Sequence, residues 1–241
     1  MKICKLCQNK VRLCNSHIIP EFLYSKIYNS NHKMIGVTGT GSNGCQKEQK
    51  GLREHLLCAD CESLLNLNYE IPFRASWYDS GLLPAVWDDP KEIKKIETEY
   101  SSFKLFHLCN LFRASVSSLP TFSEVNLGPY EEKIRKMLLS KDPGPDHEFP
   151  IYGYFTVHHK TNEVVHVVSR YVSSRYNGGR AYGVIYGGVQ WWIGISKNIF
   201  DEISGATLKQ TGLLYMHAMK MNEIGLFQDA SFALNINRNK I

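Results

Sequence analysis

The sequence predicts an α+β fold in which a small zinc-stapled module, a helical segment and an antiparallel sheet follow one another along the chain. Three observations predict this order. Two C-x-x-C pairs lie near the start, at Cys4/Cys7 and Cys58/Cys61. Apolar residues recur at helical spacing between residues 101 and 141. After residue 150 the chain becomes rich in β-branched and aromatic residues, which are separated by turn-forming stretches.

Length and composition are those of a globular chain. The protein has 241 residues, of which 43% are hydrophobic and 21% charged, enough for one large domain or two smaller units. No apolar run approaches the roughly 20 residues of a membrane helix. The polar start, "MKICKLCQNK", lacks the apolar core of a signal peptide. We therefore expect a cytoplasmic protein, and the net charge of +5 is compatible with a nucleic-acid partner.

The cysteines predict a metal site. In a reducing compartment, two C-x-x-C pairs are more typical of tetrahedral zinc than of disulfides. We predict four ligands of one structural zinc: Cys4, Cys7, Cys58 and Cys61. The 50 residues between the pairs must then leave the first pair and return to it. Cys14 is an alternative ligand, whereas Cys45 and Cys109 are interpreted as inert thiols.

The elements of the first third follow from local patterns. "KVRLCNSHIIP" predicts a short strand that ends near His17, and Pro20 stops it or opens a helix. Residues 36–51 hold five glycines and predict a surface loop or hairpin, without the Gly-Lys-Ser/Thr ending of a phosphate loop. "LREHLLCADCESLLNLNYEI" predicts that the second cysteine pair runs into an amphipathic helix.

The rest of the chain alternates between helical and extended patterns. Residues 101–118 predict a buried helix capped by Ser101 or Ser102, and residues 127–141 a second helix with Pro129 in its first turn. Residues 150–197 predict three or four antiparallel strands. "KQTGLLYMHAMKMN", near the C-terminus, predicts a last helix.

Three segments follow from these elements. They are a zinc-stapled module over 1–71, a helical extension over 72–145, and an antiparallel β-sheet region with a terminal helix over 146–241. The Pro/Gly-rich stretch "DPGPDHEFP" marks the last boundary.

A histidine at the end of a strand, facing a helix that carries a carboxylate, suits one-metal phosphodiester hydrolysis. His17 is the candidate general base, and Glu62, directly after Cys61, is the candidate helix-borne ligand of a divalent ion. In this interpretation zinc holds the small module together and takes no part in the reaction.

These residues resemble the HNH endonucleases, the zinc-containing branch of the His-Me (ββα-metal) finger nucleases. The resemblance covers about residues 1–145. It rests on three motifs: Cys4-x-x-Cys7, Ser16-His17-Ile18-Ile19-Pro20 and Leu56-Leu57-Cys58-x-x-Cys61-Glu62. It implies an HNH-like module with His17 as general base, Glu62 on a catalytic Mg²⁺ or Mn²⁺, and zinc on the four cysteines. The chain is also similar to uncharacterised bacterial HNH-like proteins with a "SHIIPEFL…LLC-x-x-CE" signature.

Two positions depart from the family pattern. Ser16 stands where the family has a metal-binding Asp, and the family's middle Asn has no match. Glu54 and His55 lie in that region and are further candidate ligands of the catalytic ion. The resemblance implies a metal-dependent endonuclease that cleaves nucleic acid, with DNA preferred, in bacterial defence or on a mobile element, where a partner protein would belong to the same system. The alternative is a non-catalytic zinc-stapled module that binds nucleic acid or protein.

Each candidate residue has a simpler explanation. His17 suits a core or zinc-ligand position, Glu62 a carboxylate favoured by the helix dipole, and His55 a surface position. Arginines interleave with aromatic residues in "SRYVSSRYNGGRAY", and Arg170, Arg175 and Arg180 are candidate nucleic-acid contacts. The simpler alternative there is a solvated hairpin edge.

Overall fold

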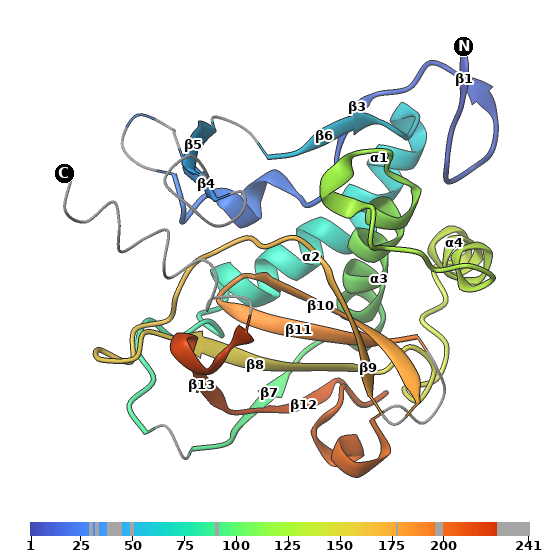
Figure 1. Cartoon of the computed structure of the whole chain (residues 1–241). Helices are drawn as coiled ribbons and strands as arrows, with labels where there is room; N and C mark the ends of the chain where they lie inside the picture. The colour runs from blue at the N-terminus through green and yellow to red at the C-terminus, as the bar shows by residue number, and fades with distance from the viewer. Residues whose placement is uncertain are drawn as a thin grey trace.

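The computed structural model describes residues 1–28, 31, 34–37, 45–48, 51–89, 92–176, 178–195 and 200–225, and gives the backbone only for 34–37 and 45–48. Within these ranges the protein is a mixed α+β structure of four α-helices and small sheets, as predicted (Figure 1). Cys45, predicted to be inert, lies outside the residues whose side chains are described.

The elements are as follows. The strands are β1 (Lys2–Ile3), β2 (Lys10–Val11), β3 (Asn15–His17), β4 (Met34–Val37), β5 (Cys45–Glu48), β6 (Arg53–His55), β7 (Lys94–Glu97), β8 (Ile151–Val157), β9 (Val172–Tyr176), β10 (Gly179–Tyr186), β11 (Val189–Gly194), β12 (Leu213–Met216) and β13 (Ala218–Lys220). The α-helices are α1 (Ala59–Leu65), α2 (Ile71–Arg74), α3 (Tyr100–Val116) and α4 (Tyr130–Ser140). Short 3₁₀ and π segments are η1 (Glu21–Tyr24), η2 (Asn66–Glu70), η3 (Ala75–Asp79), η4 (Pro120–Phe122), η5 (Asp201–Ala206) and η6 (Met221–Glu223).

The main sheet has the order β13-β8-β11-β10-β9. The pairs β8–β11, β11–β10 and β10–β9 are antiparallel, which confirms the strands predicted after residue 150. β13 adds to β8 in the parallel direction, so the sheet is mixed. The predicted last helix over 209–222 is wrong, because this segment forms β12, which pairs with β7, and β13. Leu214 and Met216 are buried and Tyr215 is exposed, which is the two-residue period of a strand.

The helix after the second cysteine pair is longer than predicted. α1, η2, α2 and η3 follow one another without a break, since each junction residue keeps right-handed helical backbone angles. Pro72 lies within this run and has no N–H to donate, and the segments on either side of it are π-helical. The chain nevertheless stays helical through the proline.

α3 begins one residue earlier than predicted and has a different cap. The Glu99 carboxylate accepts hydrogen bonds from the backbone N–H groups of Ser101 and Ser102, at 2.9 and 2.6 Å. A carboxylate at this position satisfies two backbone donors and opposes the positive end of the helix dipole. Glu99, rather than either serine, therefore caps the helix.

α3 lies at the centre of the molecule, between the N-terminal strands and the main sheet (Figure 1). Trp77 of η3 stacks on Phe155 of β8, and its indole N–H donates to the Gly187 carbonyl at 2.8 Å. His107 of α3 is fully buried, with Nδ1 2.6 Å from the Tyr186 hydroxyl. Burial lowers the pKa of His107 to about 3, so this ring is neutral in the core. One hydrophobic core therefore runs through all three predicted segments.

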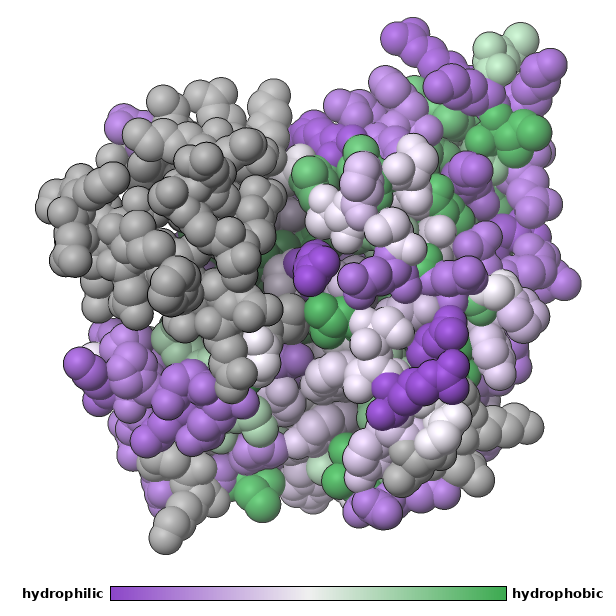
Figure 2. Space-filling model, in the orientation of Figure 1, coloured by the Kyte–Doolittle hydropathy of each residue, from purple (hydrophilic) through white to green (hydrophobic). Residues whose placement is uncertain are grey.

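Among the described residues, none of the helices combines the length and the apolar character needed to span a bilayer. On the face drawn in Figure 2, hydrophilic and apolar side chains are interspersed, and strongly hydrophilic ones gather over the β9–β10 hairpin.

Candidate functional site

The two cysteine pairs come together, as predicted. The first pair lies in the turn between β1 and β2, and the second spans the start of α1. All four Sγ atoms lie within 4.8 Å of one another, and they belong to Cys4, Cys7, Cys58 and Cys61. Among the described residues this is the one group of three or more cysteine, histidine or carboxylate ligands that could hold a metal ion. Cys14 is not part of it.

The sulfur geometry fits a tetrahedral ion. Zinc–thiolate bonds of about 2.3 Å give tetrahedral S···S edges of about 3.8 Å. The Cys7 and Cys58 sulfurs are 3.8 Å apart, well beyond the ~2.05 Å of a disulfide. Burial raises the pKa of the Cys7 and Cys61 thiols, whereas at Cys4 backbone hydrogen bonds outweigh burial and lower the pKa. Four thiolates this close together repel one another and require a nearby cation. The cluster is therefore suited to hold a metal ion such as zinc.

Neighbouring groups hold the cluster in place. The Cys58 backbone N–H donates to Cys4 Sγ at 3.3 Å. The Ser16 hydroxyl accepts the Leu57 N–H at 3.2 Å, which ties β3 to the second cysteine pair. Ser16 is buried and serves the fold at this position. From α4, Arg135 donates to the Leu6 carbonyl at 2.6 Å.

His17 lies at the end of β3 and belongs to a polar cluster. β3 pairs with β6, and His17 is directly opposite Arg53. His17 Nε2 is 2.7 Å from Glu21 Oε2, and an Arg53 nitrogen is 3.7 Å from the same oxygen. The Tyr28 hydroxyl donates to the other Glu21 oxygen. The His17 side chain is 23% exposed, so a solvent molecule or substrate can reach it.

The electrostatics of this cluster favour a neutral imidazole. Burial and the positive charge of Arg53 lower the pKa of His17, although Glu21 and Glu70 oppose the shift. Burial alone would raise the pKa of Glu21, but hydrogen bonds from Tyr28 and His17 outweigh it and the pKa falls. Glu21 is therefore an ionised acceptor, and His17 Nε2 carries the proton donated to it. Nδ1 of His17 is then the nitrogen that can accept a proton.

Glu62 is held by a buried arginine. Arg113 of α3 is 1% exposed, and it donates to Glu62 Oε2 at 3.1 Å and to Glu70 Oε1 at 2.6 Å. The other Glu62 oxygen is buried and has no hydrogen-bond partner among the described residues. Glu70 also acts electrostatically on His17. The Arg113 charge thus links Glu62 to Glu70.

Removing the Arg113 charge should destabilise the protein. We expect Arg113→Met to lower the free energy of unfolding by about 3 kcal/mol, because two largely buried carboxylates lose their partner. Urea unfolding measures the change. The triple variant Arg113→Met/Glu62→Gln/Glu70→Gln should recover part of the loss, since it leaves no uncompensated charge. Equal unfolding midpoints for wild type and Arg113→Met would show that the ion triad contributes nothing.

The other predicted ligands face different groups. Glu54, on β6, lies opposite Ser16 of β3. Its carboxylate accepts hydrogen bonds from the Ser117 and Ser118 hydroxyls and from the Ser118 backbone N–H, just after the end of α3. Burial opposes these bonds, which nevertheless lower the pKa of Glu54. His55 is exposed and lies opposite Asn15. Side chains alternate along a strand, so Glu54 points away from the face that carries Arg53 and His17.

The three arginines predicted to contact nucleic acid divide into two groups. Arg170 precedes β9 and pairs with Glu124 at 3.6 Å. Arg175 and Arg180 are direct cross-strand partners in the β9–β10 hairpin.

The sequence analysis did not predict Glu21, Glu70 or Arg113. The four-residue spacing between His17 and Glu21 was the one local signal for any of them.

No protein-family model, curated protein or solved structure matches this chain.

Proposed function

We propose that this protein is a metal-dependent endonuclease that hydrolyses phosphodiesters in nucleic acid, with DNA as the preferred substrate and His17 as the general base. The observation that carries the proposal is the 2.7 Å contact between His17 Nε2 and Glu21, on a partly exposed histidine beside Arg53. The order of β3, β6 and α1, with the cysteines at the helix start, supports an HNH-like module. In this proposal the cysteine cluster binds one structural zinc.

The residues have distinct roles in the proposed reaction. Glu21 fixes the imidazole tautomer, so Nδ1 of His17 takes a proton from a water molecule. The resulting hydroxide attacks phosphorus, and the sugar oxygen leaves with the bonding electron pair. Arg53 contributes positive charge near the scissile phosphate. A bound divalent ion would stabilise the negative charge on the phosphate and on the leaving oxygen.

Glu62 is the proposed protein ligand of the catalytic divalent ion. Its Oε1 is buried and makes no hydrogen bond among the described residues, so it is the carboxylate oxygen left for a cation. Its Oε2 stays on Arg113. Mg²⁺ is often held by one or two carboxylates, with water and substrate phosphates in the remaining positions. Such a sparse site predicts weak binding, so activity should need millimolar Mg²⁺ or be higher with Mn²⁺.

Cleavage of plasmid and oligonucleotide DNA by zinc-loaded protein, across a titration of Mg²⁺ and Mn²⁺, tests the proposal. We expect cleavage that requires the added ion. Protein that retains its zinc and cleaves neither DNA nor RNA at any concentration of either ion would contradict it.

A second candidate function is a non-catalytic module that binds nucleic acid or protein. One observation favours it: beyond the cysteine cluster, the described residues contain no group of three metal-ligating side chains. The pairing of Glu62 with Arg113 is equally consistent with a purely structural role. The same assay distinguishes the candidates, because this module would bind nucleic acid without cleaving it.

The role of Glu21 predicts a change in pH dependence. Glu21→Gln keeps the shape of the side chain but removes the negative charge that raises the pKa of His17. We expect this pKa to fall, because burial and Arg53 then act unopposed by Glu21. Activity that depends on neutral His17 should therefore persist to lower pH, while its maximum decreases as the ring loses its orienting acceptor.

Two measurements check the Glu21 prediction. The acidic limb of the pH profile of kcat/KM should move to lower pH. The midpoint of an NMR titration of the His17 ring, measured without substrate, should also move to lower pH. Glu163→Gln, an exposed change of the same type in the sheet region, should leave both unchanged. An unchanged His17 titration in Glu21→Gln would contradict the assigned pair.

A further inference from the structure

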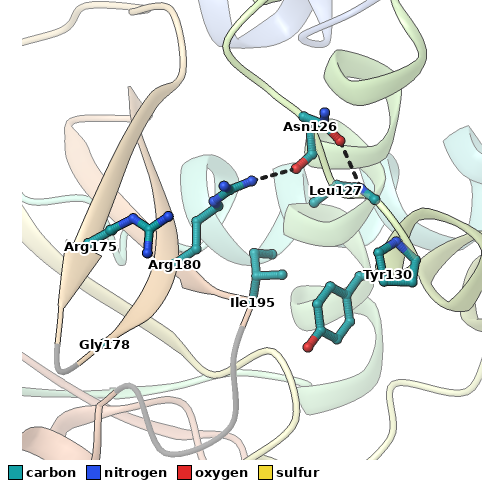
Figure 3. A pocket seen from close by; sticks show the side chains of 9 residues that line it. Asn126, Leu127, Tyr130, Arg175, Gly178, Arg180 and Ile195 are labelled. Atoms are coloured by element: carbon teal, nitrogen blue, oxygen red, sulfur yellow. Dashed lines mark hydrogen bonds between the residues drawn. The ribbon is translucent and has the colours of Figure 1, made fainter.

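We infer that a cavity between the β9–β10 hairpin and the start of α4 binds one phosphate–sugar unit of a single-stranded nucleic acid. The inference rests on the proposed function for the identity of the polymer. The cavity measures about 290 Å³. Its walls come from two places in the chain: Arg175, Gly178 and Arg180 on the hairpin, and residues 126–130, which lead into the first turn of α4 (Figure 3). Ile195, after β11, lies between them.

The charge of the cavity calls for an anion. Arg175 and Arg180 are directly opposite each other on adjacent strands, where like charges destabilise a sheet. None of the described residues that line the cavity is acidic. Two carboxylates of neighbouring elements pair with other arginines, Glu132 with Arg135 and Glu124 with Arg170. A bound phosphate would relieve the repulsion between the two guanidinium groups.

The two arginines differ in their hydrogen bonding. Arg180 reaches toward the opposite wall and donates to the Asn126 carbonyl at 3.1 Å (Figure 3). The Tyr182 hydroxyl donates to the same carbonyl at 2.7 Å, which fixes that wall. The exposed Arg175 side chain makes no hydrogen bond or ion pair to another described residue. One guanidinium is thus preorganised and its neighbour is available, an arrangement suited to a phosphate.

The size and the aromatic surroundings indicate more than a bare phosphate. A volume near 300 Å³ is at the lower end of small-ligand sites and leaves room for a sugar or base beside the phosphate. Tyr130 forms part of the wall and is 39% exposed. An exposed aromatic ring beside arginines is typical of surfaces on which unpaired bases stack. A single strand can place its bases there, whereas a duplex keeps them in the helix.

Fluorescence anisotropy with a labelled single-stranded DNA 20-mer, in buffer without Mg²⁺ or Mn²⁺, tests the inference separately from cleavage. We expect Arg175→Ala to weaken binding about three- to tenfold at 0.1 M salt and to reduce the slope of log K against log salt by about 0.7, the value for one phosphate contact. Arg175→Lys should retain part of the affinity, since it keeps the charge and loses the planar fork.

Arg74→Ala is the matched control, because it removes one 61%-exposed arginine outside the cavity. It should change binding less than twofold. The melting temperature of Arg175→Ala should be unchanged or higher, since a like-charge pair is removed. The inference is overturned if Arg175→Ala binds as wild type does, if Arg74→Ala weakens binding equally, or if the wild type binds no single-stranded DNA. Preference for a duplex, a phosphopeptide or inorganic phosphate over the 20-mer would overturn it as well.

Cleavage assays of the same variants separate this inference from the proposed function. If the wild type cleaves DNA and Arg175→Ala binds and cleaves as the wild type does, the cavity is refuted and the nuclease proposal remains intact. Specific loss of binding in Arg175→Ala, without cleavage by any variant, would support the cavity and refute the nuclease.

Discussion

The substitution Cys58→Ser is expected to abolish metal binding and to unfold the N-terminal part of the chain. Four sulfurs lie within 4.8 Å of one another, and the strands around them are very short, so few other interactions hold them together. Structural zinc in small modules contributes about 10–16 kcal/mol at neutral pH. Net domain stabilities are only about 5–15 kcal/mol. Loss of one thiolate should therefore disrupt β1, β2 and the start of α1.

Elemental analysis and a thermal scan measure this effect. The wild type should carry about one zinc per chain, and Cys58→Ser should carry much less and melt at a lower temperature or in two steps. Cys14→Ser is the matched control, because Cys14 is outside the cluster and partly buried. It should keep its zinc and its melting temperature. Metal-free wild type that melts where the zinc-loaded protein does would contradict a stabilising role.

His17→Ala is expected to lower the rate of nucleic-acid cleavage by about 10² to 10⁴-fold, the usual effect of removing a general base. The loss should be in kcat, since in the proposed reaction His17 accepts a proton and contributes little to holding the substrate. Stability should change little, because the side chain is partly exposed and, among the described residues, its one hydrogen bond is to Glu21. Single-turnover cleavage at saturating Mn²⁺, together with the melting temperature, measures both quantities.

His147→Ala is the control for the His17 experiment. His147 is 69% exposed, and its contact with Asp146 is long, at 3.9 Å. It should cleave as the wild type does. A wild type that cleaves nothing, combined with a large loss of stability in His17→Ala, would identify His17 as a structural residue and favour the binding module.

Some features were predictable because they depend on neighbours in the sequence. Two residues between paired cysteines let both sulfurs reach one ion, so the zinc-type cluster followed from spacing. The strand ending at His17 and the strands of the main sheet followed from short-range patterns. The last helix was mispredicted because Leu and Met also suit helices, and pairing with β7 and β8 decided for strands.

The sequence by itself determined the four-cysteine cluster, the mixed α+β class and the position of His17. Only the tertiary structure decided which charges meet. Arg113 reaches Glu62 and Glu70 across 51 and 43 residues of chain, and residues 126–130 face Arg175 and Arg180 across a similar interval. A local pattern reports the shape and polarity of one segment. Such contacts depend on how several segments pack together, because a buried charge selects its partner from whatever the folded chain brings near it.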